Sequence, residues 1–406
     1  MAFDSVPSRG DHVSLLNRGG NDVSVAAIDM IAKLVGFATV SRDSNLALIE
    51  YVSSYLADLG VESRLVPNAD NSKANLFATI GPMVSGGVVL SGHTDVVPVD
   101  GQPWDSDPFS VTEKSGRLYG RGTADMKSFY AIALAMVPEM LERGLTRPIH
   151  LALSYDEEIG CLGAPAMIAR IAAELPAPLA VVVGEPTDMR VVTAHKSISS
   201  FETVVTGHEA HSSQTHRGVS AVMVAARLIT YLEDMARENA RGPASGTPFE
   251  PPYSTIHVGT VAGGTATNII SRECRFSWDM RCIPEDDPQQ FVERFRGYCD
   301  DAMLPAMQAV APAASIVTTP ACAVPALRPE SDGAAEALVR SLSGYNASDA
   351  VAYAAEAGQF QQAGFSTVIC GPGSIDQAHQ PNEYIEKTQV HACIEFMRRL
   401  IDVQAA

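Results

Sequence analysis

The sequence predicts an α/β fold with a mainly parallel sheet, interrupted by an inserted split βαβ (ferredoxin-like) domain. Three observations predict it. Helical and strand patterns alternate over the first 190 residues, a β-α-β-β-α-β order follows between residues 197 and 318, and the α/β pattern then resumes after a proline-rich stretch. We therefore expect one α/β domain built from residues 1–195 and 319–406, with a smaller domain at 196–318 inserted into it.

The first part of the chain alternates between the two periodicities. A helical period runs through Val23–Leu34, and a second helix is expected from the N-cap candidates Ser44 or Asn45 to a stop at Gly60. Further helical stretches lie near Lys127–Arg143 and Ala164–Glu174. Short β-rich runs occur at Asn75–Ile80, Gly87–Ser91, His150–Ser154 and Ala180–Val183. Such alternation indicates βαβ units on a mainly parallel sheet.

The inserted segment has a different pattern. Strands are expected at 197–207, 255–262, 272–282 and 314–318, and helices at 218–240 and 286–308. After the proline-rich stretch, a helix at 333–342, a strand at Thr367–Cys370 and a helix at 387–402 return to the first pattern. The order of the inserted elements is that of a split βαβ sandwich.

Composition excludes several classes of protein. The 406 residues are 46% hydrophobic and carry a formal net charge of −18, which argues against a nucleic-acid binder and against an anionic membrane surface. No apolar run reaches the roughly 20 residues of a membrane-spanning helix, and no secretory leader is expected at Met1. Seven cysteines without a CxxC pair favour free thiols in a reducing compartment. We therefore expect a cytoplasmic protein with neither nucleic acid nor membrane as partner.

Histidines and carboxylates follow several of the predicted strands. They are His93 and Asp95 in SGHTD, Glu157 and Glu158 in YDEE, Glu185 in GEPT, and His379 in AHQP, while Asp125 precedes a predicted helix in GRGTADMK. Open α/β sheets place their ligands at the carboxyl ends of their strands. Imidazole and carboxylate ligands without thiolates suit Zn²⁺, Co²⁺ or Mn²⁺.

Each of these residues also has an ordinary structural interpretation. A single histidine after a strand is commonly a cap or a core residue, and adjacent glutamates commonly form a solvated turn. Asp125 could cap the following helix, and Glu185 could belong to a simple turn before Pro186. Spacing alone leaves both interpretations open.

Five motifs, taken together, resemble one known family. The runs SGHTDVVP (91–98), GRGTADMK (120–127), YDEEIG (155–160), GEPT (184–187) and GPGS…AHQPNEY (371–384) are similar to those of the M20 family of dinuclear zinc amidohydrolases and exopeptidases. Within that family they look most like the acetylornithine deacetylase group. The resemblance covers about residues 25–400 and implies a catalytic α/β domain with an inserted lid or dimerisation domain.

The resemblance implies a set of metal ligands. His93 and Glu185 match terminal ligands of a first ion, Glu158 and His379 match ligands of a second, and Asp125 matches the carboxylate that bridges them. The implied cofactors are two divalent ions per chain, with Zn²⁺ favoured over Co²⁺. The family also tends to hold the peptide bond after the bridging aspartate in cis.

Further roles follow from the same resemblance. Glu157 matches the general base and Asp95 the acid that orients a metal-bound imidazole. In the inserted domain, His211 matches an oxyanion donor, and Asn268 and Arg281 match contacts to a substrate carboxylate.

Two more residues are candidates for substrate contact, and they bear on specificity. Glu356 resembles an acid that could pair with an ornithine ammonium group, with an ordinary loop or helix-end carboxylate as the alternative. Gly373 could contribute a backbone donor. Ser128 departs from the glycine that many relatives carry at this position, a difference that bears on side-chain specificity.

The expected reaction is therefore hydrolysis of the amide of an N-acyl-L-amino acid, with N-acetyl-L-ornithine of arginine biosynthesis as the favoured substrate. A succinyl-diaminopimelate desuccinylase, an aminoacylase and a dipeptidase are alternatives on the same metal platform. A non-catalytic binding protein of the same fold would be expected to lack a ligand or the base, and every matching position is filled. The family also implies a homodimer through the inserted domain.

Overall fold

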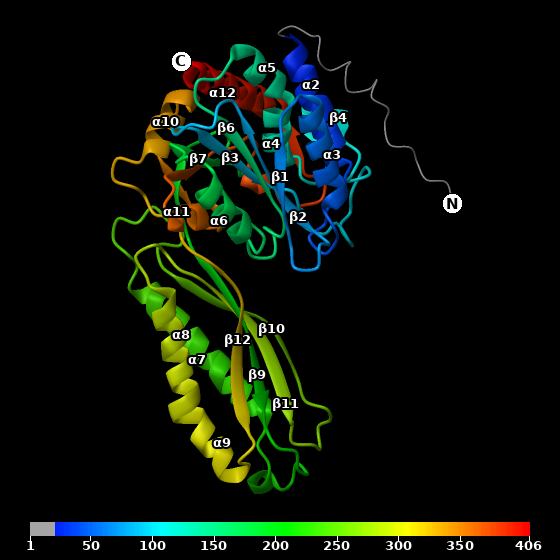
Figure 1. Ribbon diagram of the computed structural model, residues 1–406. Coiled ribbons are helices and arrows are strands. Elements are labelled where there is room, and N and C mark those ends of the chain that lie inside the picture. The colour runs from blue at the N-terminus through cyan, green and yellow to red at the C-terminus, as the bar shows by residue number, and fades with distance from the viewer. Residues whose placement is uncertain (1–20) are drawn as a thin grey trace, which may run out of the picture. The chain divides into compact units, whose positions relative to one another are not determined.

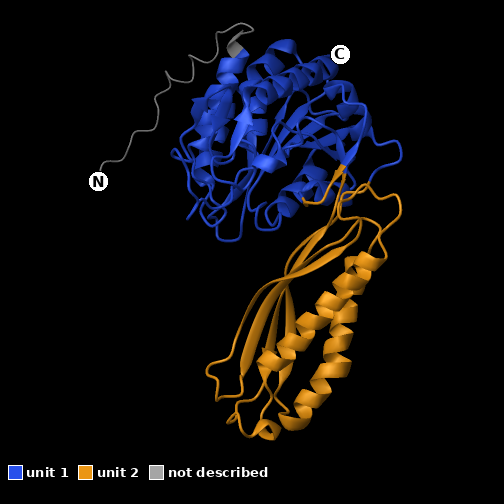
Figure 2. Cartoon of the chain, turned by 180° about the vertical axis from the view of Figure 1, so that it is seen from behind, with its two compact units in different colours: residues 1–193, 329–349, 355–406 blue, residues 194–328, 350–354 orange. Residues whose placement is uncertain are grey.

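The computed structural model describes residues 21–406. The expectation that no secretory leader begins at Met1 concerns residues outside this range. The described chain divides into two compact units (Figure 2). Unit 1 comprises the chain up to Thr193, Pro329–Asp349 and Ala355–Ala406, and unit 2 comprises Ala194–Arg328 and Ala350–Ala354.

Unit 1 is built on an eight-stranded mixed sheet with the strand order β1-β2-β6-β3-β7-β14-β8-β13. Figure 1 labels β1, β2, β3, β6 and β7 of this sheet. The strands are β1 (Ser63–Pro67), β2 (Ala74–Ile80), β3 (Val88–His93), β6 (Ile149–Ser154), β7 (Ala180–Val183), β8 (Val192–His195), β13 (Asp349–Val351) and β14 (Thr367–Ile369). The four central strands, β6, β3, β7 and β14, are parallel. β2 and β8 pair antiparallel with the outer members of this group, so the α/β class predicted from the sequence is confirmed, with antiparallel flanks added to the parallel centre.

Helices cover both faces of this sheet. They are α2 (Asn21–Val35), α3 (Leu46–Asp58), α4 (Lys127–Ala135), α5 (Val137–Arg143), α6 (Ala164–Glu174), α10 (Ala334–Ser343), α11 (Ala357–Gln362) and α12 (Lys387–Ala405). Alternate residues of β3, such as Val88 and Leu90, join one core cluster with α2, α4 and α12. α6 and α11 cover the opposite face (Figure 1). Because both faces are covered, all six residues of β3 are buried.

Two differences from the predicted helices have local causes. The single helix expected near Lys127–Arg143 is divided into α4 and α5, and Pro138 stands at the start of α5, where its missing N–H costs no hydrogen bond. The helix expected at 286–308 is α8 (Pro288–Gly297), a π-helical turn η2 (Tyr298–Met303) and α9 (Leu304–Val310), with Pro305 in the first turn of α9.

A small three-stranded sheet in unit 1 supports the loops around the carboxyl edge of the large sheet. It consists of β4 (Thr112–Lys114), β5 (Arg117–Tyr119) and β15 (Tyr384–Glu386) in the order β15-β5-β4. β5 and β15 pair antiparallel, so that Tyr119 lies opposite Tyr384. The segment with Asp125 follows β5, and the segment with His379 precedes β15. The short 3-10 helix η3 (Ile375–Gln377) lies in the latter segment.

Unit 2 is an antiparallel sheet with the order β10-β11-β9-β12 and helices packed against it. Its elements are β9 (Ile198–Thr206), the 3-10 helix η1 (Thr215–Arg217), α7 (Ala221–Arg241), β10 (Thr255–Gly263), β11 (Glu273–Arg281), the helices α8 to α9, and β12 (Ser315–Val324). This is the predicted β-α-β-β-α-β order. Ser220 caps α7 through a hydrogen bond from the Met223 amide, as the N-cap preference for serine predicts. β12 continues past residue 318, so unit 2 extends to Arg328.

No helix among residues 21–406 is long and apolar enough to cross a membrane. All seven cysteines lie within this range, and each is buried with a free thiol.

Candidate metal centre

The candidate site lies at the carboxyl edge of the four parallel strands of unit 1. Each strand end, or the segment after it, contributes side chains, because neighbouring parallel strands end at one edge of a sheet. The contributing residues are His93 at the end of β3, Glu157 and Glu158 after β6, Glu185 after β7, His379 after β14, and Asp125 just before α4.

Asp125 lies between two imidazoles. Its Oδ1 is 3.0 Å from Nε2 of His93, and its Oδ2 is 3.3 Å from Nε2 of His379. Glu185 Oε1 lies 3.7 Å from the His93 nitrogen, and Glu158 Oε2 lies 3.0 Å from the His379 nitrogen. The five side chains thus form two neighbouring sets, each with one histidine and one glutamate, and Asp125 is shared by both.

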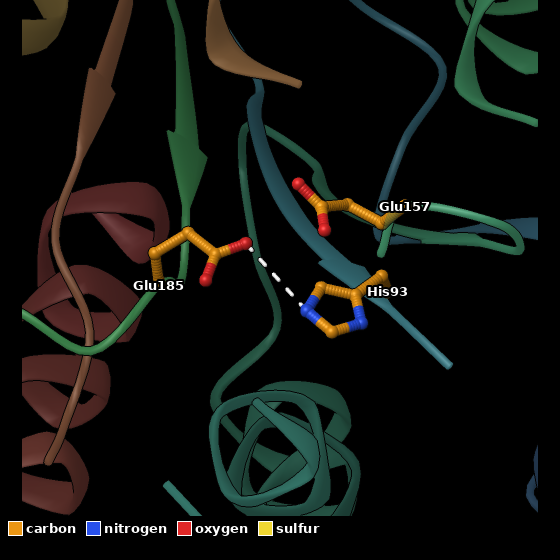
Figure 3. Close-up of side chains that lie close together, drawn as sticks. All are labelled: His93, Glu157 and Glu185. Carbon is orange, nitrogen blue, oxygen red and sulfur yellow. Dashed lines mark ion pairs between the residues drawn. The ribbon is translucent and has the colours of Figure 1, made fainter. Parts of the chain in front are cut away.

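Two groups of donor atoms are compact enough to hold an ion. The nearest donor atoms of His93, Glu157 and Glu185 lie within 4.8 Å of one another, and so do those of His93, Asp125 and Glu158. Figure 3 shows the first group, with the two carboxylates directed toward the imidazole from the ends of different strands. Glu157 therefore lies among the donors, next to the position that the sequence assigns to a metal ion.

The buried carboxylates of this site would be stabilised by a bound cation. Burial, with a smaller contribution from neighbouring carboxylates, raises the pKa of Glu185 well above its usual range. Burial and neighbouring carboxylates together raise the pKa of Glu157 to about 8, against the opposing charge of His93. Burial also opposes ionisation of Asp125, but hydrogen bonds from His379 and His93 outweigh it and hold the pKa of Asp125 below its usual range. Oε1 of Glu185 is buried without a hydrogen-bond partner among the described residues. A divalent cation would supply both the missing partner and the opposite charge, so these residues fit one.

Backbone contacts set the orientation of His93. Its Nδ1 lies 2.9 Å from the carbonyl oxygen of Asp95, which can only accept, so Nδ1 carries a hydrogen. Nε2 is therefore the ring nitrogen that faces Asp125 and the one that would bind an ion after losing its own hydrogen. The Asp95 carboxylate lies farther away, with Oδ1 3.7 Å from Nδ1. It accepts hydrogen bonds from the backbone amides of Glu157 (3.1 Å) and Glu158 (3.3 Å) and from the hydroxyl of Ser41 (2.7 Å). Asp95 thus orients the His93 imidazole through its backbone carbonyl and holds the loop of Glu157 and Glu158 through its carboxylate.

Glu356 lies beneath the site, at the beginning of α11. It is completely buried, and its carboxylate accepts hydrogen bonds from the hydroxyls of Ser91 (2.5 Å) and Ser154 (2.7 Å), near the ends of β3 and β6. In this structure the partners of Glu356 are therefore two serines. Gly373 has a φ of 89° and accepts a hydrogen bond from the Asp188 amide at its carbonyl oxygen.

The other three candidate residues belong to unit 2. His211 and Asn268 lie on adjoining segments, because His211 bridges to Ile269 and the Ser212 amide donates to the Asn268 carbonyl. The His211 side chain is exposed, and its Nδ1 lies 2.8 Å from the Ser213 hydroxyl. Arg281 ends β11, and its Nε lies 3.4 Å from an oxygen of Asp279.

Sequence reasoning missed three residues around the site. The Cys161 thiol donates to Glu157 at 3.2 Å, and a buried pair, Arg121 and Glu383, lies behind Asp125. Arg121 and Glu383 stand inside the motifs GRGTADMK and AHQPNEY, so the motifs contained a signal for them. The Asp125–Met126 peptide bond is cis, as the resemblance implied.

Comparison with known proteins identifies the family. Residues 89–403 match the family described as peptidase family M20/M25/M40, so the chain belongs to this family and is a metal-dependent amidohydrolase. The chain is 34% identical over 382 residues to the acetylornithine deacetylase of Proteus mirabilis (strain HI4320), covering 92% of this chain and 96% of the relative. It is also 34% identical over 362 residues to the acetylornithine deacetylase of Shigella sonnei (strain Ss046), covering 88% and 91%.

Solved structures of the family share the fold. An M20 family metallo-carboxypeptidase from Sulfolobus solfataricus matches with a TM-score of 0.70 at 18% identity, covering 93% of this chain and 99% of that one. A dinuclear metal-binding peptidase of the M20 family from Bacillus subtilis matches with a TM-score of 0.63 at 14% identity, covering 95% and 99%. The predicted family and fold class are therefore confirmed.

Proposed function

We propose that the chain hydrolyses N-acetyl-L-ornithine to ornithine and acetate, as a step of arginine biosynthesis, with two Zn²⁺ ions as the preferred cofactors and Co²⁺ as a substitute. The observation that carries the metal chemistry is the position of Asp125, whose two oxygens face two different histidines at 3.0 and 3.3 Å. The acetyl-ornithine assignment is supported by relatives of that name at 34% identity over most of the chain.

Four side chains complete the proposed ligand set around Asp125, namely His93 and Glu185 for one ion and Glu158 and His379 for the other. Two divalent ions held by these residues would polarise the amide carbonyl as Lewis acids and would lower the pKa of a water molecule. The remaining chemistry belongs to the protein. Glu157 takes the proton from the attacking water and returns it to the leaving amine nitrogen. A buried carboxyl with a raised pKa is suited to hold that proton between the two transfers.

The proposed substrate contacts come mainly from unit 2. His211 donates a hydrogen bond to the oxyanion of the tetrahedral intermediate, and Arg281 and Asn268 bind the α-carboxylate of the substrate. Backbone groups near Gly373 add a polar contact. Glu356 is the proposed determinant for the ornithine ammonium group, which would have to reach its buried carboxylate near the ends of β3 and β6.

The role of Glu157 is tested by Glu157→Gln, which preserves the size of the side chain but cannot take a proton. We expect kcat to fall by about 10²–10⁴-fold, the usual contribution of a general base, while metal content stays at two ions per chain. Glu142→Gln, at an exposed position of α5, is the control and should leave kcat unchanged. A near-wild-type kcat for Glu157→Gln would remove Glu157 from the role of base.

The substrate is tested by a panel on Zn²⁺-loaded protein. We expect kcat/KM to be highest for N-acetyl-L-ornithine among that compound, succinyl-diaminopimelate, N-acetylmethionine and a dipeptide. A higher value for one of the other three would assign the chain to the desuccinylase, aminoacylase or dipeptidase activity and contradict the deacetylase proposal.

We further propose a homodimer through unit 2 and a location in the cytoplasm. The outer strands of the unit 2 sheet carry exposed apolar side chains, including Val261 of β10 and Val317 of β12, and a partner would cover such edges. The seven free thiols are consistent with a reducing compartment. Light scattering during size-exclusion chromatography tests the dimer, and a mass of one chain at every protein concentration would contradict it.

A further inference from the structure

A buried carboxylate outside the donor set, that of Glu383, contacts the backbone of the segment that carries Asp125. Glu383 is only 1% exposed. Its Oε1 accepts hydrogen bonds from the backbone amides of Ala124 (2.8 Å) and Asp125 (3.1 Å), and its Oε2 accepts one from the Arg121 guanidinium at 2.6 Å. Both oxygens are therefore engaged by the loop that presents Asp125, and Glu383 is not free to bind an ion itself.

The same guanidinium reaches the segment that carries His379. Its second amino group donates to Oε1 of Gln102 at 2.7 Å, and Nε2 of Gln102 donates to the carbonyl oxygen of His379 at 3.0 Å. His379 has a φ of 62°, in the left-handed region, which a non-glycine residue adopts stably only when its surroundings hold it there. Hydrogen bonds thus run without interruption from the Asp125 backbone to the His379 backbone.

This side-chain network begins where the backbone ladder ends. β5 and β15 pair as far as Tyr119 and Tyr384, and one more backbone bond joins the Gly120 amide to the Glu383 carbonyl. Past this point the Asp125 and His379 segments have no strand pairing with each other. The Arg121–Glu383 pair lies at this point and continues the connection.

We propose that Arg121 and Glu383 are positioning residues that hold the side chains of Asp125 and His379 in place for metal binding, with Gln102 as the link to His379. This inference rests on the metal site of the proposed function but not on its substrate. A pair that served only fold stability would lower the melting temperature when broken and leave the metal affinity of the folded protein unchanged. A positioning pair changes that affinity, because each ligand must be oriented before it can bind.

The experiment compares Glu383→Gln with Glu386→Gln in the full-length protein. Glu386 pairs with Arg117 at 2.8 Å and joins the same two strands, β5 and β15, but both side chains are more than one-third exposed. Neither side chain forms a hydrogen bond or an ion pair with Asp125 or His379. Metal-free proteins are titrated with Zn²⁺ in competition with a chromophoric chelator, and circular dichroism verifies that each is folded. We expect the dissociation constant of at least one Zn²⁺ to rise 10–100-fold in Glu383→Gln, as for other residues that support metal ligands, and to change less than about twofold in the control.

A second variant keeps the proposal testable if Glu383→Gln fails to fold. Gln102→Leu leaves the Arg121–Glu383 ion pair intact but removes the Gln102 hydrogen bonds to the His379 carbonyl, the Arg121 guanidinium and the Trp104 indole. It should therefore weaken the Zn²⁺ site that includes His379 and spare the other. The positioning role would be overturned if a folded Glu383→Gln protein bound Zn²⁺ as tightly as the wild type. If Glu383→Gln does not fold, unchanged Zn²⁺ affinities in Gln102→Leu would overturn it. If the wild-type protein bound no Zn²⁺, the proposed metal site would fail as well, whereas an unexpected substrate with intact Zn²⁺ binding would leave this inference standing.

Discussion

His150 in β6 is a buried histidine whose charge state should make unit 1 sensitive to acid. It is completely buried, and its Nδ1 lies 2.9 Å from the Thr79 hydroxyl. Its Nε2 has no hydrogen-bond partner among the described residues, and Gly87 lies so close that an added Cβ would be 2.6 Å from that nitrogen. A proton on Nε2 would therefore meet neither water nor an acceptor. Burial accordingly lowers the pKa of His150 to about 4.

The size of the effect follows from linkage. The folded pKa is depressed below the unfolded value of about 6.5, so the unfolded chain binds the proton more readily. The contribution of His150 to the free energy of unfolding is therefore fully present above pH 6.5 and is lost as pH falls from 6.5 toward 4. At about 1.4 kcal/mol for each pKa unit, the contribution of His150 is about 3 kcal/mol over the whole interval, of which about 2 kcal/mol is lost by pH 5.

His150→Asn tests this prediction, because asparagine can still form a hydrogen bond with the Thr79 hydroxyl but does not titrate. The chain has two tryptophans, so a Trp278→Phe background leaves Trp104 as a fluorescent reporter for unit 1. Urea unfolding of the metal-free proteins at pH 7 and pH 5 gives the free energy of unfolding. We expect the protein with His150 to lose about 2 kcal/mol more between these pH values than His150→Asn. Equal losses, within about 0.5 kcal/mol, would show that His150 does not titrate as its burial implies.

Three further predictions concern the metal ions, the oxyanion donor and a helix cap. Prolonged dialysis against a chelator should abolish activity and added Zn²⁺ or Co²⁺ should restore it; full activity in protein shown to be metal-free by mass spectrometry would contradict the metal chemistry. His211→Ala should lower kcat about 10²–10³-fold without changing metal content, and a kcat within threefold of wild type would exclude the oxyanion role. Ser220→Ala, which removes the N-cap of α7, should destabilise unit 2 by about 1 kcal/mol in urea unfolding followed by Trp278 fluorescence, whereas an unchanged midpoint would mean that the cap does not stabilise α7.

The strands at the centre of the large sheet could be predicted because they are continuous apolar runs, as in Val88–Leu90. A parallel strand that is covered on both faces buries every side chain, so its sequence is apolar throughout. Shorter strands were missed for the converse reason. β4 (Thr112–Lys114) is exposed throughout, and β13 (Asp349–Val351) is only partly buried, so neither has an apolar pattern to detect. Their pairing depends on neighbours that are distant in sequence.

The candidate site could be predicted in its residue types and its place on the fold. His93, Glu158, Glu185 and His379 follow strands whose carboxyl ends meet at one edge, and the motifs identified them. The convergence of Asp125 with His93 and His379 needed coordinates, since Asp125 follows the small sheet and not one of the four central strands. The roles of these residues remain predictions until metal binding is measured.

The amino-acid sequence by itself determined the α/β class, the inserted β-α-β-β-α-β unit and the family, because periodicity and short motifs are local properties of the chain. Only the tertiary structure decided which atoms meet. It directs Nδ1 of His93 to a backbone carbonyl, gives Glu356 two serine partners, and joins Arg121 to Glu383 across 262 positions of sequence. The physical reason is that hydrogen bonds and ion pairs depend on distances of about 3 Å, and those distances are set by how strands and loops pack together.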